Sequence, residues 1–528
     1  MMFAILLLVS ISAVNVLSVD NIVVTNNGPV LGQDRGNYNT YFGIPYALVD
    51  EKKPFGKSLQ HPDFASPFNA TDSTVRCPQS VPTPGGILQC LRLNIFVPKT
   101  INKQLPVFVW FHGGGFVFGN GGEYDAKHLV RHDIIVVTIN YRLGPYGFFC
   151  LNTDEVPGNQ GLKDQLTALK WVKKNIASFG GDPNKVTIAG ESYGGGSVEM
   201  HLYSETEKLF DKAIIQSGGV DAEALIVKEN RNAAYTLAKV FQPEVKKQDA
   251  VNVLAKQDPV EVMKAFGSSG MLLRACLEKR QRKGGNFFTK KSIALYSPQK
   301  VKDTHIMIGY NSKETFADFM RLPDDGYARD IFLEKIRNNF KLKGKRLEEA
   351  TRLVKTFYLG NKNISKETML ELVDFTSDFM INYPEERAIT RFLNQSAVIY
   401  KYLFSYTGNS PYKDVEGVGA YHTEELQFLF DWGTMKELTG DENILMRDRM
   451  TTMWANFVKY GIPTPKETNN LPVIWQQVSR NTRSYLDIDR DFKMREDVYK
   501  DRIEFWNGFW QIYGKYRKPY RSEPEVAA

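Results

Sequence analysis

Val186-Thr187-Ile188-Ala189-Gly190-Glu191-Ser192-Tyr193-Gly194-Gly195-Gly196 is the stretch that decides the fold of this chain. Its first four residues are β-branched or apolar, which favours a buried strand. The strand breaks into Gly190-x-Ser192-x-Gly194, and residues 197–202 can continue as a helix. A serine in such a strand–turn–helix unit sits in a strained turn that glycine neighbours allow, so its hydroxyl stands clear of the sheet. The stretch indicates a nucleophilic Ser192, with a plain glycine-rich turn as the alternative.

The segments around this stretch predict an α/β fold. Residues 105–111 and 134–139 are apolar on both faces, as in parallel strands that are covered by helices on both sides. Helical spacing over 166–176 follows, and the order strand, strand, helix, strand, helix is typical of a doubly wound sheet. Further strands are expected at 21–25, 41–46, 93–97, 213–215, 305–308 and 397–402, and helical caps at about 230–285 and 330–394.

Composition and charge set limits on the class of protein. The chain has 528 residues, 42% of them hydrophobic, and no linker, repeat or low-complexity block, so residues 19–528 are expected to form one domain. The net charge of +7 is mild for this length. The basic runs at 279–283 and 341–346 contain no interleaved aromatic residues and are interpreted as solvated surface. No nucleic-acid partner is predicted.

The first 18 residues favour secretion. They are apolar and uncharged, and small residues precede a cleavage point before Val19, as in a signal peptide; a buried first strand is the alternative. No other stretch approaches the ~20 apolar residues that a membrane span needs. Residues 522–528 carry neither a retention signal nor a hydrophobic anchor tail. We therefore expect an extracellular protein without a membrane span.

Sequons and cysteines are compatible with that route. Asparagine glycosylation is expected at Asn69, Asn363 and Asn394, each of which begins an Asn-x-Ser/Thr sequon. Cys77 and Cys90 are close enough in sequence to close a short disulfide loop, which an oxidising compartment permits. The sequence leaves the state of Cys150 and Cys276 open.

A second glycine-rich motif, His112-Gly113-Gly114-Gly115, directly follows the apolar run 105–111. Backbone without side chains can lie flat against a ligand and point its N–H groups at one place. An oxyanion hole requires such fixed donors where negative charge develops in a tetrahedral intermediate. Because the motif lies upstream of a G-x-S-x-G turn in an α/β chain, it predicts acyl-transfer chemistry; a glycine-rich turn without function is the alternative.

With these motifs in order, the chain resembles the type-B carboxylesterase and cholinesterase family of α/β-hydrolases. Other motifs that carry the resemblance are at 42–47, 90–94, 140–144, 157–165, 179–183 and 216–218. The resemblance runs over nearly the whole chain after residue 18 and implies a mostly parallel sheet with helices on both faces and helical cap insertions. In the general character of its sequence, the chain looks similar to the secreted antennal and integument esterases of insects.

The resemblance also implies a Ser-Glu-His triad, and the order nucleophile, acid, histidine is usual in this fold. Glu314 matches the family's acid site after Ile308-Gly309-Tyr310-Asn311, and His422 matches its histidine loop at 419–426. His422 would take the proton of Ser192 and later give it to the leaving alkoxide. Glu314 would hold the imidazole tautomer and stabilise the imidazolium.

Supporting residues carry over from the same family. The oxyanion donors correspond to the backbone N–H groups of Gly114, Gly115 and Tyr193. Glu191 is expected either to steady the charged histidine or to belong to a buried polar network, and Ser217 resembles a serine that supports the acid. No cofactor or metal is implied.

Three departures from the family stand out. Tyr193 replaces the alanine that commonly follows the nucleophile, and its ring must find room near the site. Leu88-Gln89 replaces an acidic pair, which puts in doubt a salt bridge that usually anchors the cysteine loop. Residues 219–225 lack the tryptophan that often lines the acyl pocket, so we expect tolerance of bulkier acyl groups.

Two kinds of metal site, a zinc helix and a calcium loop, do not match the spacing of the residues in this chain. The run from His422 to Leu426 lacks the second histidine of a zinc helix. The run 487–491 begins like a calcium loop, but Phe492 and Val498 occupy the glycine and glutamate positions. A metal enzyme is therefore not predicted.

The predicted function is hydrolysis of lipophilic carboxylic esters by a secreted serine esterase. The preferred role is that of a generalist acting on xenobiotic or dietary esters, and the second is degradation of odorant or pheromone esters. A juvenile hormone esterase is an alternative, although in that group the turn that carries the nucleophile (the elbow, residues 190–194 here) commonly reads G-Q-S-A-G. Tyr193 and the missing tryptophan argue against a cholinesterase. A catalytically weak protein that sequesters ligands is the alternative from another class. The natural ester and the oligomeric state are not assigned.

Overall fold

The computed structural model describes residues 21–221, 225–279, 285–287, 289, 298–302, 304–433 and 437–518. The predicted signal peptide, residues 222–224 of the predicted acyl side, most of the basic run at 279–283 and the C-terminal residues 522–528 lie outside these ranges. None of the helices within them is both long enough and apolar enough to cross a membrane.

The centre of the described structure is a sheet of eleven strands in the order β18-β17-β15-β14-β11-β10-β7-β9-β6-β4-β3. The strands are β3 (Gln33–Asp34), β4 (Tyr38–Pro45), β6 (Arg92–Pro98), β7 (Leu105–Phe111), β9 (Ile135–Ile139), β10 (Gly181–Glu191), β11 (Lys212–Gln216), β14 (His305–Asn311), β15 (Val398–Phe404), β17 (Ser484–Ile488) and β18 (Lys493–Glu496). Strands β9 to β17 pair in parallel, and the pairs at both ends are antiparallel. The mostly parallel sheet confirms the predicted α/β class.

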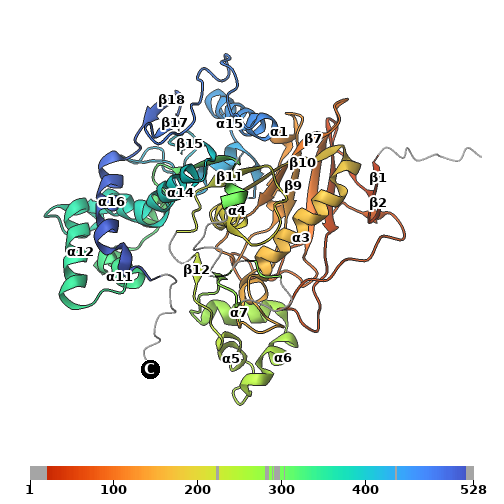
Figure 1. Cartoon of the computed structure of the whole chain (residues 1–528), viewed down its shortest axis with the longest axis horizontal. Helices are drawn as coiled ribbons and strands as arrows, with labels where there is room; N and C mark the ends of the chain where they lie inside the picture. The colour runs from red at the N-terminus through yellow and green to blue at the C-terminus, as the bar shows by residue number, and fades with distance from the viewer. Residues whose placement is uncertain are drawn as a thin grey trace, which may run out of the picture.

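Both faces of this sheet are buried, as the apolar runs predict. Along β7, Val107 and Val109 belong to one hydrophobic cluster, whereas Phe108 and Trp110 belong to another. Successive side chains of a strand point to opposite faces, so the two clusters lie on the two sides of the sheet. Helix α3 (Gln160–Asn175) and α4 (Tyr193–Tyr203) cover the first face, and α15 (Asp441–Tyr460) covers the second (Figure 1).

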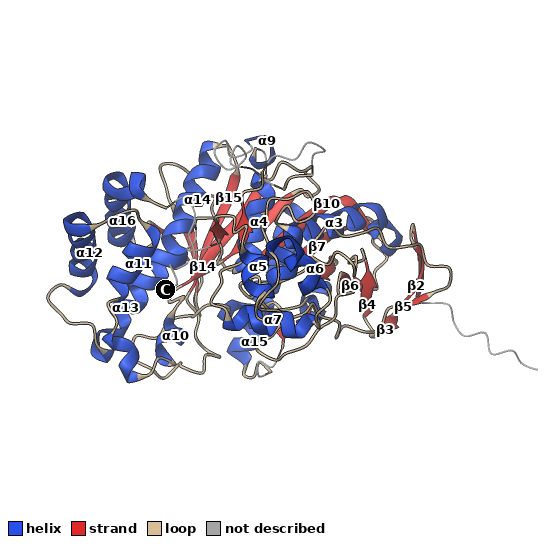
Figure 2. Cartoon of the chain, turned by 90° about the horizontal axis from the view of Figure 1, so that it is seen from below, coloured by secondary structure: helices blue, strands red, loops and turns tan. Residues whose placement is uncertain are grey.

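A helical region lies beyond one end of the sheet. It comprises α11 (Ile331–Asn339), α12 (Gly344–Leu359), α13 (Met369–Ser377), α14 (Tyr383–Asn394) and α16 (Lys500–Tyr513). Phe332, Phe375 and Trp506 join three of these helices in one aromatic-rich cluster. Figures 1 and 2 show α11, α12 and α16 at the end of the molecule opposite β1 (Ile22–Thr25) and β2 (Gly28–Leu31). The predicted cap over 330–394 is therefore helical.

The remaining described elements are β5 (Phe68–Asn69), β8 (Tyr124–Asp125), β12 (Ile226–Val227), β13 (Ala275–Cys276), β16 (Asp431–Trp432), α1 (Lys127–Val130), α2 (Gly144–Phe148), α5 (Ala233–Ala238), α6 (Ala250–Ala255), α7 (Pro259–Ser268), α9 (Pro298–Val301) and α10 (Phe316–Met320). Within the described residues 230–279, the expected helical segment ends at Ser268. After α7 the chain returns as β13, which pairs in parallel with β12.

Two disulfides brace the structure. Cys77 and Cys90 close a short loop, and Cys150 pairs with Cys276 across 126 residues. In the first loop, Gln89 hydrogen bonds to the backbone of Val49 and to the Glu51 carboxylate. Its Oε1 accepts from Val49 N at 3.1 Å, and its Nε2 donates to Val49 O at 3.0 Å.

Candidate active site

Ser192 occupies a tight turn between the central strand β10 and helix α4. Its φ of 57° and ψ of −125° place it in backbone space that residues with side chains rarely adopt. The glycines on either side are required by packing: a Cβ on Gly190 would lie 2.4 Å from the carbonyl carbon of Gly194, and a Cβ on Gly194 would lie 2.0 Å from Phe111 O. Helix α4 begins at Tyr193, four residues earlier than the sequence indicated.

Glu314 and His422 meet beside this turn. Glu314 follows the carboxyl end of β14, and His422 lies in the long connection after β15. His422 Nδ1 lies 2.7 Å from Glu314 Oε2, and the His422 backbone N–H donates to Glu314 O at 2.9 Å. The other carboxylate oxygen, Oε1, accepts from Ser217 Oγ and from the Asn311 N–H, both at 2.7 Å. The buried Glu314 carboxylate is thus held by three donors.

Ser192, Glu314 and His422 line one pocket of about 190 Å³. Its other lining residues are Tyr193, Ser217, Gly218, Gly219, Leu225, Thr315, Asp318, Met380 and Ile381. The His422 side chain is 31% exposed, so the imidazole can be reached from the pocket. Loops at the carboxyl ends of parallel strands are the usual ligand site of α/β sheets, and this is where the sheet brings the three residues together.

The second imidazole nitrogen faces Glu191. His422 Nε2 lies 3.1 Å from Glu191 Oε1, although the two atoms are not aligned as a hydrogen bond. Among the described residues no hydrogen bond joins Ser192 Oγ to His422; without substrate, such bonds are often long or misaligned. Burial raises the pKa of Glu191. Burial alone would lower the pKa of His422, but the carboxylates of Glu191 and Glu314 outweigh it and raise that pKa.

The glycine loop after β7 lies against the nucleophile. A Cβ on Gly113 would lie 2.9 Å from Glu191 O and 3.1 Å from Ser192 Cβ, so a side chain there would force the backbone to shift. Gly114 and Gly115 have φ values of 93° and 65°, in the region that glycine adopts without strain. Tyr193 is the first residue of α4, so its N–H has no partner within the helix. The predicted oxyanion donors therefore belong to two segments that meet beside Ser192.

His112 packs beside this loop as an uncharged side chain. Its ring stacks on Tyr141 with centroids 4.4 Å apart, and its Nδ1 lies 2.9 Å from Gly113 O. The Tyr141 hydroxyl donates to His112 O at 2.6 Å. Burial lowers the pKa of His112 to about 4, so the ring is neutral at physiological pH. Its place in the motif is explained by support of the glycine backbone.

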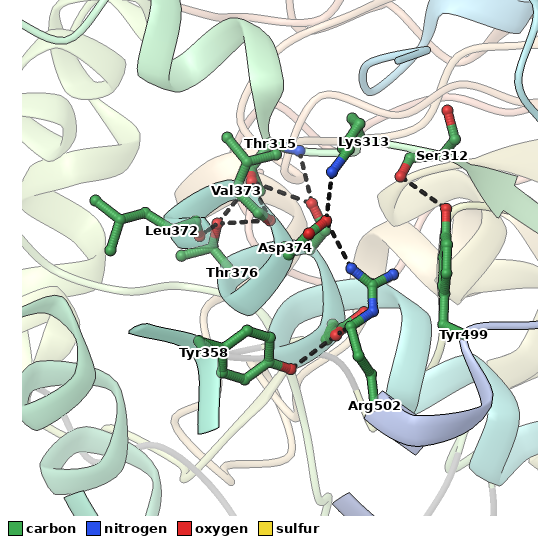
Figure 3. A network of polar contacts seen from close by, with 12 residues as sticks. Ser312, Lys313, Thr315, Tyr358, Leu372, Val373, Asp374, Thr376, Tyr499 and Arg502 are labelled. Atoms are coloured by element: carbon green, nitrogen blue, oxygen red, sulfur yellow. Dashed lines mark hydrogen bonds and ion pairs between the residues drawn. The ribbon is translucent and has the colours of Figure 1, made fainter. Parts of the chain in front are cut away.

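The segment that carries Glu314 is fixed to the helical region (Figure 3). Three contacts do this: Lys313 Nζ to Asp374 Oδ1 at 2.7 Å, Thr315 Oγ1 to Thr376 Oγ1 at 2.6 Å, and Tyr499 OH to Ser312 O at 2.9 Å. Arg502 Nη1 lies 2.6 Å from the same Asp374 oxygen. Both neighbours of Glu314 are therefore tied to α13, and α13 is tied to α16. Sequence reasoning missed this network, because ion pairs between distant helices leave no local pattern.

A second network that sequence reasoning missed fixes the histidine loop. Asn311 Nδ2 donates to Tyr421 O at 2.6 Å and to Glu425 Oε2 at 2.7 Å. Gln216 Nε2 donates to Glu425 Oε1 at 2.9 Å, and Trp454 Nε1 donates to Gln216 Oε1 at 2.9 Å. Gln216, Asn311 and Glu425 all stand inside quoted motifs, so the signal was present although their partners were not deducible.

The other predicted positions lie away from the pocket lining. Asn69, Asn363 and Asn394 are exposed, as glycan attachment would require. Asp487 and Ile488, which begin the calcium-like run, belong to strand β17. Glu424 Oε2 accepts from the Tyr421 N–H at 2.9 Å, a contact within the histidine loop.

Comparisons with known proteins agree with this geometry. The Carboxylesterase family model matches residues 19–506. Cholinesterase from Mus musculus is 29% identical over 550 residues, covering 93% of this chain and 87% of that protein. Bile salt-activated lipase from Rattus norvegicus is 30% identical, covering 90% and 82%. A solved PNB esterase superposes with a TM-score of 0.73 at 26% identity and covers 92% of this chain and 99% of its own. The chain belongs to the carboxylesterase family and has its α/β-hydrolase fold.

Proposed function

We propose that the chain is a secreted serine carboxylesterase that hydrolyses lipophilic carboxylic esters through an acyl-enzyme on Ser192. The observation that carries this proposal is the shared pocket of Ser192, Glu314 and His422, with Glu314 on the Nδ1 side of the imidazole at 2.7 Å. Membership of the carboxylesterase family supports the reaction class.

In the first step Ser192 Oγ attacks the ester carbonyl carbon while His422 Nε2 takes its proton. The developing oxyanion accepts hydrogen bonds from the N–H groups of Gly114, Gly115 and Tyr193, which the protein holds in place before the reaction. The tetrahedral intermediate collapses, the C–O bond to the alcohol breaks, and the imidazolium gives its proton to the departing alkoxide. Glu314 keeps Nδ1 protonated and compensates the positive charge.

The second step repeats the first with water. His422 takes a proton from a water molecule, whose oxygen attacks the acyl-enzyme carbonyl. Collapse of the second tetrahedral intermediate returns the proton to Ser192 Oγ and releases the acid. The chemistry needs only groups of this chain and water.

The acyl side of the pocket supports substrates with bulky acyl groups. Gly218, Gly219 and Leu225 line it, so two of the positions after Ser217 present no side chain. Secretion is supported by the two disulfides and the exposed sequons. Clearance of xenobiotic, dietary or odorant esters is the role that we propose for such an enzyme.

One observation favours a second candidate, a ligand-sequestering protein with weak turnover. His422 Nε2 faces Glu191 at 3.1 Å, whereas proton transfer requires it to face Ser192 Oγ. A protein arrested in this arrangement would bind esters but acylate slowly.

The test is hydrolysis of p-nitrophenyl esters from acetate to octanoate by the full-length secreted protein, with Ser192→Ala beside it. We expect a burst of p-nitrophenol followed by steady turnover, both lost in Ser192→Ala, and an optimum longer than acetate. Stoichiometric labelling by an organophosphate without ester turnover would instead support the sequestering protein.

A further inference from the structure

Tyr193, which stands where relatives commonly have alanine, has a cationic partner. Arg274 Nε donates to the Tyr193 hydroxyl at 3.1 Å, and the guanidinium carbon lies 5.1 Å from the centre of the ring. Arg274 lies two residues before Cys276, which is bonded to Cys150, so its backbone is anchored at β13. Arg274 Nη1 also donates to Leu273 O at 2.8 Å. The phenol and the guanidinium are thus held together.

The Tyr193 ring also contacts the glycine loop. The Tyr193 ring packs edge-on against Phe116, with centroids 4.9 Å apart, and Phe116 directly follows Gly115. A Cβ on Gly115 would lie 3.8 Å from Arg274 Nη2, in ordinary contact. The pair therefore joins both segments that supply the predicted oxyanion donors: Tyr193 belongs to the turn at Ser192, its ring contacts Phe116 of the glycine loop, and the Arg274 guanidinium lies near Gly115.

Arg274 has no direct ion-pair partner among the residues that the structure describes. Among the described residues, no carboxylate lies within ion-pair distance of its guanidinium, which hydrogen bonds only to a phenol and a backbone carbonyl. Additional negative charge develops on the substrate oxygen when the tetrahedral intermediate forms. A fixed cation in a partly buried site favours that state over the neutral ester.

We propose that Tyr193 and Arg274 form a positioning pair for the oxyanion hole. The pair clamps the glycine loop to the elbow and places one positive charge next to it, and so stabilises the tetrahedral intermediate more than the bound ester. This inference rests on the proposed esterase function and assigns a role to the residue that departs from the family.

The experiment compares Arg274→Met and Tyr193→Phe with wild type. Lys279→Met is the matched control, because Lys279 is an exposed cation on the same segment. Each protein is assayed for kcat and KM on p-nitrophenyl butyrate. Each is also titrated with a trifluoromethyl ketone, which forms a hemiketal oxyanion on Ser192, and with the corresponding methyl ketone, which reports binding of a neutral carbonyl.

In Arg274→Met we expect kcat to fall about 10-fold with KM nearly unchanged, less than the ~10²–10³-fold that loss of a direct oxyanion donor costs. The affinity for the trifluoromethyl ketone should fall by the same factor, and the affinity for the methyl ketone should stay. Tyr193→Phe keeps the ring and loses one hydrogen bond, so about a 3-fold change in the same direction is expected. Lys279→Met should match wild type.

A change in KM and methyl-ketone affinity, with kcat and the hemiketal inhibitor unaffected, would overturn the proposal, because the pair would then only shape the pocket. Equal behaviour of Arg274→Met and Lys279→Met would overturn it as well. If Arg274→Met does not fold, as judged by circular dichroism, Tyr193→Phe carries the same test. The esterase function is judged separately, by whether wild-type turnover disappears in Ser192→Ala.

Discussion

Two glutamates face the two nitrogens of the His422 ring. Both are buried, but they differ in their hydrogen bonds. Their side chains are 0% exposed for Glu314 and 3% for Glu191. Glu314 accepts from His422, Ser217 and Asn311, each at 2.7 Å. Glu191 Oε1 lies 3.1 Å from His422 Nε2 and has no hydrogen-bond partner within the described part of the chain.

The difference shows that donors, rather than burial, decide what a buried carboxylate does. Three donors fix the position of Glu314, so it can hold one tautomer of the imidazole. Glu191 lacks such donors at Oε1, and burial raises its pKa. Because no hydrogen bond holds Nε2 to Glu191 Oε1, that nitrogen is available to Ser192 when an ester is bound.

The largest effect should come from Glu314→Gln, which removes the carboxylate that three donors hold in place. The glutamine side chain has nearly the same shape, but its amide does not enforce a protonated Nδ1, and kcat should fall by about 10⁴-fold, as for loss of a triad acid. The measurement is kcat on p-nitrophenyl butyrate, with the melting temperature as a check of folding. Activity within 10-fold of wild type would mean that Glu191, rather than Glu314, supports the histidine.

A smaller loss is expected from Ser217→Ala, which removes one of the three donors to Glu314. A hydrogen bond to a charged group is worth about 1.5–3 kcal/mol, so kcat should fall about 10- to 100-fold. Ser204→Ala is the control, because Ser204 is also buried and hydrogen bonded, to His201 O at 3.0 Å, but does not line the pocket. If both variants keep the wild-type kcat, two donors are enough to hold Glu314.

Elements with strong local patterns could be predicted from the sequence. Strand β7 matches its apolar run at both ends, and four β-branched or apolar residues predict the strand before Ser192, although β10 begins earlier, at Gly181. Strands β17 and β18 were not predicted. The β17 sequence mixes polar and apolar residues, and it is stabilised by pairing with β15, about 80 residues earlier.

Site residues could be predicted only where they stand in a sequence motif that indicates their chemistry. Ser192, Glu314 and His422 stand in recognisable segments, and the structure brings them to one pocket. The partners of these segments were not predictable: Arg274 meets Tyr193 across 81 residues, and Cys150 meets Cys276 across 126. Such pairs arise from tertiary packing, because nothing in the flanking sequence marks either member for the other.

The smallest effect is a shift in the pH dependence of kcat/KM, which tests the role of Glu191. The carboxylates of Glu191, Glu314 and Glu425 together raise the pKa of His422. Glu191→Gln removes one of these charges, so the pKa of His422 should fall by about 1–3 units. Neutral imidazole is the base, so a lower pKa makes the base available at lower pH, and the acid limb of kcat/KM should move to lower pH.

Asp318→Asn is the control for that shift. Asp318 lines the same pocket but is exposed, so water and salt screen its charge from His422. We therefore expect its profile to overlay that of wild type. An acid limb that does not move in Glu191→Gln would mean that Glu191 carries no negative charge beside His422. The two carboxylates would then differ in charge as well as in donors, and Glu314 alone would set the protonation of the base.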